Sequence, residues 1–226
     1  MKLNRRSVLG AIGMIGVGTG AAFGSGAFTT VEAQREVEVN VLGGEDGIEL
    51  LNPDDDDQGN LDQEIEDRED EIANNIAGNF ADVLVDTSSS NIAVSAGDTT
   101  YSGSQLFPVF SDTYDSVDNE YVSLVANDVT VVFGPSGNEL PTNSTLTQNN
   151  LFALVSTGNF DVAFTSENAT NARLLTQIGG SDVGDTGSAS SATGTVDNDT
   201  TLLNATVDTG ETATETEDLT IEITEN

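Results

Sequence analysis

The sequence predicts a mainly β protein, an antiparallel β-sandwich of jelly-roll or Ig-like type with one short helix and long acidic or polar loops. Three observations lead to this class. Short apolar runs recur from residue 82 to the end of the chain, turn-forming clusters such as Gly134 to Asn138 separate them, and a single segment has helical spacing. Many short strands at regular intervals between turns are typical of a sandwich.

Taken in order along the chain, the first expected strand covers residues 35–41, where Val alternates with Glu and Asn. A helix is expected next, because Ile65, Ile72 and Ile76 are spaced seven and four residues apart, and it should end near Gly78. Further expected strands cover residues 82–86, 92–95, 106–110, 121–127, 129–133, 151–156, 161–165, 173–178, 202–208 and 219–224.

The N-terminal residues 1–27 have the organisation of a signal peptide. Arg5 and Arg6 precede an apolar stretch rich in Gly and Ala, and small residues end at Ala27. The Arg-Arg-Ser-Val-Leu run is similar to the twin-arginine signal, which exports folded proteins. We therefore expect cleavage before Phe28 and export to the cell surface or the medium. The alternative is an anchor that stays attached, although the segment is short and glycine-rich for a span of about 20 apolar residues.

The rest of the chain, residues 28–226, is expected to form a single domain, with an acidic insertion at 53–72 and a flexible loop at 179–200. The loop is expected because that segment is rich in Gly, Ser, Asp and Thr.

The charge of the chain indicates a halophilic archaeon as its source. Asp and Glu number 39 and Lys and Arg six, which gives a net charge of −33. Only Arg35, Arg68 and Arg173 are basic beyond residue 6. Multimolar salt shortens the Debye length to about 3 Å and suppresses the repulsion, while hydrated carboxylates keep the protein soluble. So few cations exclude nucleic acid as a partner, and a membrane as a partner after signal cleavage.

The chain has no Cys and no His. This excludes disulfides, cysteine nucleophiles, Ser-His-Asp triads, and zinc or blue-copper sites built on histidine. We therefore expect a non-catalytic protein without a cofactor, with calcium as the one metal to consider.

The calcium hypothesis depends on the acidic insertion. Asp54, Asp56 and Gln58, with Gly59 and Asn60, resemble the start of an EF-hand loop, but position twelve is Ile65 instead of Glu. The calcium site expected here is a surface site built from Asp54, Asp56, Asn60 and Asp62. The alternative is a solvated acidic loop. Four Asn-x-Ser/Thr sequons are candidate glycosylation sites, at Asn143, Asn168, Asn198 and Asn204.

Two parts of the chain resemble known exported proteins. The run Gly-Ser-Gly-Ala-Phe-Thr-Thr-Val-Glu-Ala-Gln-Arg at 24–35 is similar to the start of an exported haloarchaeal family of unknown function. Its Ala-Phe-Thr junction, with the Gly-Glu turn at 210–211 before a last apolar strand, is distantly similar to the TasA/camelysin family of extracellular matrix-fibre proteins. The protease activity described for camelysins is not implied, because an H-E-x-x-H motif is lacking.

This resemblance implies a structural protein, a filament or matrix subunit that assembles with itself or with other cell-surface proteins by N-terminal strand exchange. The residues expected to insert into the next subunit are Phe28, Val31, Val37, Val39 and Val41. Alternatively, the same strand pairs within its own sheet. The second expected function is a secreted binding module for calcium, carbohydrate or a surface-protein ligand, and the third is a secreted hydrolase.

Overall fold

The computed structural model describes residues 61–109, 113–114, 117–167, 174–184, 191–197, 199–209 and 217–226. The expected first strand at 35–41 and the signal peptide lie outside these residues. Within them, no helix has the length and apolar character needed to cross a membrane.

The expected helix is confirmed as α1 (Leu61–Asn79), followed directly by the first strand. Its Ala73, Ile76 and Ala77 are buried, which is the stripe that the isoleucine spacing predicted. The helix begins eleven residues before the expected end of the acidic insertion at 53–72, so the second half of that insertion is helical instead of a loop.

The protein is mainly β, with antiparallel pairing in every sheet, as the sequence predicts. A short 3-10 helix, η3, covers Gly103–Gln105. The strands are β1 (Asp82–Asp86), β2 (Ile92–Ala96), β3 (Thr99–Tyr101), β4 (Tyr121–Ser123), β5 (Thr130–Phe133), β6 (Ser144–Val155), β7 (Asn159–Glu167), β8 (Leu175–Ile178), β9 (Ser181–Asp182), β10 (Ala192–Asp197), β11 (Thr200–Thr209) and β12 (Asp218–Glu225).

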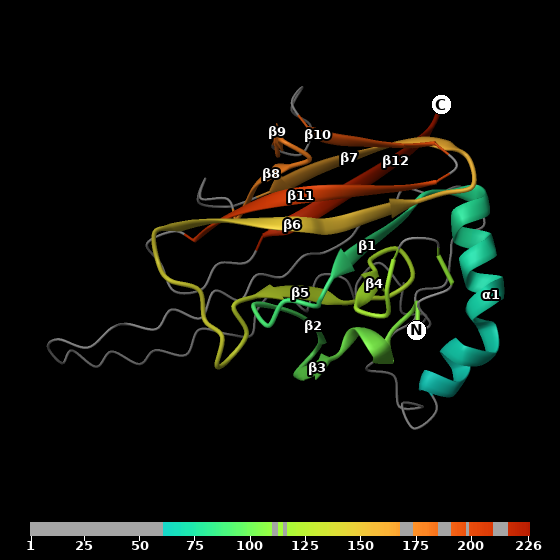
Figure 1. Ribbon diagram of the computed structural model, residues 1–226, viewed down its shortest axis with the longest axis horizontal. Coiled ribbons are helices and arrows are strands. Elements are labelled where there is room, and N and C mark those ends of the chain that lie inside the picture. The colour runs from blue at the N-terminus through green and yellow to red at the C-terminus, as the bar shows by residue number, and fades with distance from the viewer. Residues whose placement is uncertain are drawn as a thin grey trace, which may run out of the picture.

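The strands form three sheets, in the orders β4-β1-β6-β11-β8-β9, β10-β7-β12 and β3-β2-β5. The first two lie face to face as a sandwich, and the third lies beyond β1 at the other side of the molecule (Figure 1). The rings of Phe152 on β6 and Phe164 on β7 lie 5.5 Å apart between the two sandwich layers. One continuous core of buried side chains joins all three sheets and α1.

The packing of β10 explains why the sequence did not predict this strand. Residues 179–200 were expected to form a flexible loop, but they contain β9 and β10. Ala192, Gly194 and Val196 line the inner side of β10, and a Cβ on Gly194 would lie 2.6 Å from Leu154 and 2.8 Å from Leu203. Because the layers approach so closely, this strand has almost no apolar signal in the sequence.

The expected strand at 106–110 is wrong. Leu106, Phe107 and Pro108 are buried, but they lie in a turn that follows η3. Pro108 has no N–H to give to a ladder, and the carbonyl of Phe107 accepts hydrogen bonds from the backbone N–H of Ser123 and the side chain of Asn127. Similarly, the strand expected at 121–127 ends at Ser123, where a turn begins.

Candidate functional site

The C-terminal end of α1 is fastened to the turn between β6 and β7. The carbonyl of Ala77 accepts hydrogen bonds from the backbone N–H and the hydroxyl of Thr157, at 2.9 and 2.7 Å. The Ser156 hydroxyl donates to the carbonyl of Phe80, at 3.2 Å. These contacts satisfy carbonyls that a helix end leaves without a partner, and they fix α1 against the end of the sandwich.

A buried polar cluster lies where α1, β1 and β4 meet. Asp82, at the start of β1, has no exposed surface. Its carboxyl group accepts hydrogen bonds from the Tyr114 and Ser123 hydroxyls, both at 2.6 Å. The Ser123 oxygen in turn accepts from the backbone N–H groups of Val125 and Ala126. Asp82 therefore holds together a strand, a turn and the segment that carries Tyr114.

The ionisation of this cluster is perturbed by burial. Loss of water raises the pKa of Asp82 to about 6, although the hydrogen bonds from Ser123 and Tyr114 act in the opposite direction. The pKa of Tyr114 is raised above its ordinary value, first by burial and then by the charge of Asp82. On α1, the buried carboxyl of Glu69 accepts a hydrogen bond from the hydroxyl of Thr113. Two buried acids thus hold the adjacent residues 113 and 114.

A carboxyl group with a pKa near 6 has the ionisation that a general acid or base needs. Asp82 has no surface that a substrate could reach, however, and both of its oxygens bond to protein hydroxyls. This arrangement is suited to fastening the fold, not to proton transfer with a substrate.

A cavity of about 370 Å³ lies beside the cluster, between α1 and the turns that end the sandwich. Its lining includes Asn74, Tyr114, Ser156, Thr157 and Asp199. The hydroxyls of Tyr114, Ser156 and Thr157 already donate hydrogen bonds to the protein. The side chain of Asn74 and the exposed carboxylate of Asp199 are polar groups that the cavity offers to a small ligand, although one Asp199 oxygen already accepts a hydrogen bond from the N–H of Thr200.

The long edge of the smaller sandwich layer is a second candidate site. Among the described residues, β12 pairs with β7 alone. The layer's other edge strand, β10, lies beside β11 and β6 of the larger sheet. An edge strand offers a row of backbone N–H and C=O groups to a further strand.

The register of β12 shows which groups point outward. The N–H of Asn226 donates to the carbonyl of Asn159, at 2.9 Å. Hydrogen-bonded pairs alternate along an antiparallel ladder, so residues 218, 220, 222 and 224 bond to β7. Leu219, Ile221, Ile223 and Glu225 then direct their N–H and C=O groups away from β7.

The side chains of β12 follow the same alternation. Leu219 and Ile221 are buried and Ile223 is half-buried against the core, whereas Glu222 and Thr224 are exposed. A strand that pairs with this edge would need apolar residues on its inner face and polar residues on its outer face.

The structure describes few of the residues that the sequence singled out. Most of them lie outside the described residues. These are the signal residues Arg5 and Arg6, the junction Ala27–Phe28, the assembly residues Val31, Val37, Val39 and Val41, the expected calcium ligands Asp54, Asp56 and Asn60, and the sequons at Asn168 and Asn198. Asp62 lies in the first turn of α1 instead of in a loop. Among the described residues, no group of three or more acidic side chains is placed to hold a metal ion.

Neither the Asp82 cluster nor the β12 edge is among the sites that the sequence predicts. An acid inside the apolar run from Ala81 to Val85 was a signal for the first of these. The second had no sequence signal, because an edge is a property of the sheet order.

Comparison with known proteins gives no relative. No family model, no curated protein and no solved structure matches the chain. What is established is the class, a mainly β protein with sandwiched antiparallel sheets. The resemblance to exported haloarchaeal and TasA/camelysin proteins stays a hypothesis.

Proposed function

We propose that this is a non-catalytic structural protein of the cell surface or extracellular matrix of a halophilic archaeon, and that its subunits join by strand addition at β12. The observation that carries the proposal is the outward row of backbone groups on Leu219, Ile221 and Ile223. Peptide strands that bind sheet edges obtain affinity from backbone hydrogen bonds and specificity from alternate side chains.

The chain contains a segment of the matching pattern. In residues 35–41, Val37, Val39 and Val41 alternate with Glu and Asn. Paired with β12, the three valines continue the apolar inner face, and the polar residues continue the outer face beside Glu222. Removal of a signal peptide before Phe28 frees this segment at the chain's end.

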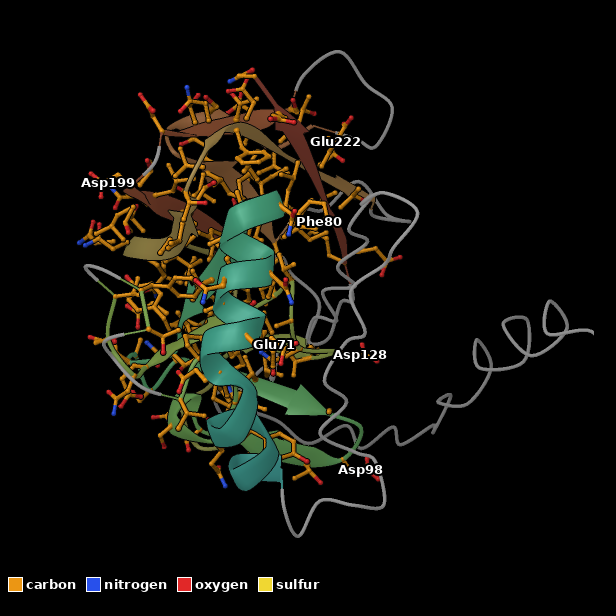
Figure 2. The ribbon with its side chains drawn as sticks, turned by 90° about the vertical axis from the view of Figure 1, so that its right-hand side faces the viewer. Glu71, Phe80, Asp98, Asp128, Asp199 and Glu222 are labelled. Carbon is orange, nitrogen blue, oxygen red and sulfur yellow. The ribbon has the colours of Figure 1, made fainter. Side chains whose placement is uncertain are left out.

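The charge distribution supports a role in concentrated salt. Exposed acids are spread over all parts of the described molecule, on α1, on β12 and in turns (Figure 2). Figure 2 labels Glu71, Asp98, Asp128, Asp199 and Glu222 among them. Contact between two such surfaces requires that salt screen their repulsion, so assembly should proceed in multimolar salt and fail in dilute buffer.

A secreted binding module is the second candidate, and the cavity beside α1 favours it. Asn74 and Asp199 could bind a small polar ligand there, carbohydrate included. Among the described residues that line the cavity, Tyr114 is the one aromatic side chain, and its hydroxyl is already bound to Asp82; for this reason we rank this function below strand addition.

Export is tested by the N-terminus of the protein recovered from culture. We expect the protein in the medium or on the cell surface, and Edman degradation should give Phe-Thr-Thr, the sequence that starts at Phe28. A double variant with Arg5→Lys and Arg6→Lys should remain in the cytoplasm with its N-terminus intact. Recovery of the full-length chain from wild-type membranes would instead show an anchor and rule out a free N-terminal strand.

A further inference from the structure

Two of the four sequons lie among the described residues, and their surroundings differ. We propose that Asn143 is a glycosylation site and that Asn204 is not. The inference rests on the proposed export, since the modifying enzyme and its sugar donor act at the outer face of the membrane. A protein exported in the folded state meets that enzyme with its strands already paired.

Asn204 is held in the folded sheet. It lies within β11, between β6 and β8. Its side-chain oxygen accepts a hydrogen bond from the N–H of Asn150, at 2.8 Å, and its backbone carbonyl accepts one from Gly179, also at 2.8 Å. The third sequon residue, Thr206, pairs with strands on both sides. Seating this sequon in an enzyme would require breaking the middle of the sheet.

Asn143 itself lies outside the strands, and the next two residues, Ser144 and Thr145, pair on one side only, with Thr209 and Asp208 of β11. Asn143 is exposed, it precedes β6 in a turn, and its φ of 51° lies in the left-handed region that Asn tolerates. Neither its side chain nor that of Thr145 makes a hydrogen bond to a described residue. Within the described residues, this end of β6 pairs with β11 alone, because β1 pairs only with residues 152–155.

The reaction is a transfer of saccharide from a lipid-linked sugar phosphate. A bond forms between the Asn143 Nδ2 atom and the anomeric carbon, and the bond from that carbon to the phosphate oxygen breaks. The side-chain nitrogen loses one proton and the departing phosphate accepts it. The hydroxyl of Thr145, two residues on, is the group that the sequon requires, and it is exposed here.

The acidic composition of the chain makes the test direct. Cleavage after Asp and Glu releases residues 140–161, with Asn143, and residues 200–208, with Asn204, as separate peptides. In protein recovered outside the cells, mass spectrometry should find the saccharide on the first peptide and none on the second. Thr145→Val should remove it completely, whereas the matched change Thr206→Val should leave it in place.

Two results overturn the inference, and they can be told apart. An exported protein whose 140–161 peptide is unmodified, or whose 200–208 peptide is modified, contradicts the site while export stands. A wild-type protein that stays in the cytoplasm without saccharide contradicts export and the site together. The wild-type peptide map decides between these results even if a variant fails to fold.

Discussion

Replacing Asp82 by Asn is expected to remove from the pH dependence of stability the contribution of one buried acid, about 3 kcal/mol. The folded-state pKa of Asp82 is about 6 and its ordinary value is 3.8. An acid whose pKa is raised on folding holds its proton more tightly in the folded state. The contribution of Asp82 to the unfolding free energy is therefore most favourable below pH 3.8, and it is lost as the pH rises through 6. A shift of about two units corresponds to about 3 kcal/mol of unfolding free energy.

The measurement is denaturant unfolding in multimolar KCl at several pH values between 3 and 8. Other acids also titrate in this range, so the informative quantity is the difference in unfolding free energy between wild type and D82N. We expect this difference to change by about 3 kcal/mol in favour of D82N as the pH rises. Asp98→Asn removes the same charge at an exposed turn and serves as the matched control for the loss of one carboxylate. Parallel curves for wild type and D82N would mean that Asp82 does not titrate in this way.

The variant Ile223→Pro is expected to abolish assembly while leaving the subunit folded. The N–H of Ile223 points away from β7, so proline removes no bond between β12 and β7 but places its ring against an incoming strand. Loss of the half-buried isoleucine should cost about 1–2 kcal/mol of folding stability. We expect sedimentation of wild type as polymer and of I223P as monomer at equal concentration in high salt.

The matched control is Ile223→Ala, which loses the same side chain but keeps the N–H. It should assemble, with weaker affinity than wild type. Polymer formation by I223P would show that β12 is not the accepting edge, and loss of assembly in both variants would place the effect in the side chain instead of the backbone.

The sequence predicted the parts of the fold whose signals are local. The apolar alternation around Val162 and Ile221 predicted β7 and β12, and the isoleucine spacing predicted α1. The sequence did not predict β10, because the layers pack so closely around Gly194 that a larger side chain would not fit there. It wrongly predicted a strand at Phe107, because an apolar run is buried there without entering a sheet.

The candidate sites were harder to predict because they depend on contacts between distant segments. Tyr114 lies 32 residues and Ser123 lies 41 residues after Asp82 along the chain. No sequence pattern predicts that the three side chains meet. The β12 edge follows from the sheet order. The sequence could offer only the complementary strand at 35–41.

Whether subunits join through strands is tested most directly by electron microscopy of the mature protein, residues 28–226, in multimolar KCl. We predict filaments or linear oligomers that lengthen with protein concentration and disappear when residues 28–41 are removed. Monomers at every concentration, with residues 28–41 protected from protease, would contradict strand addition. That result would mean that the strand pairs within its own sheet, and a binding module would then be the better interpretation.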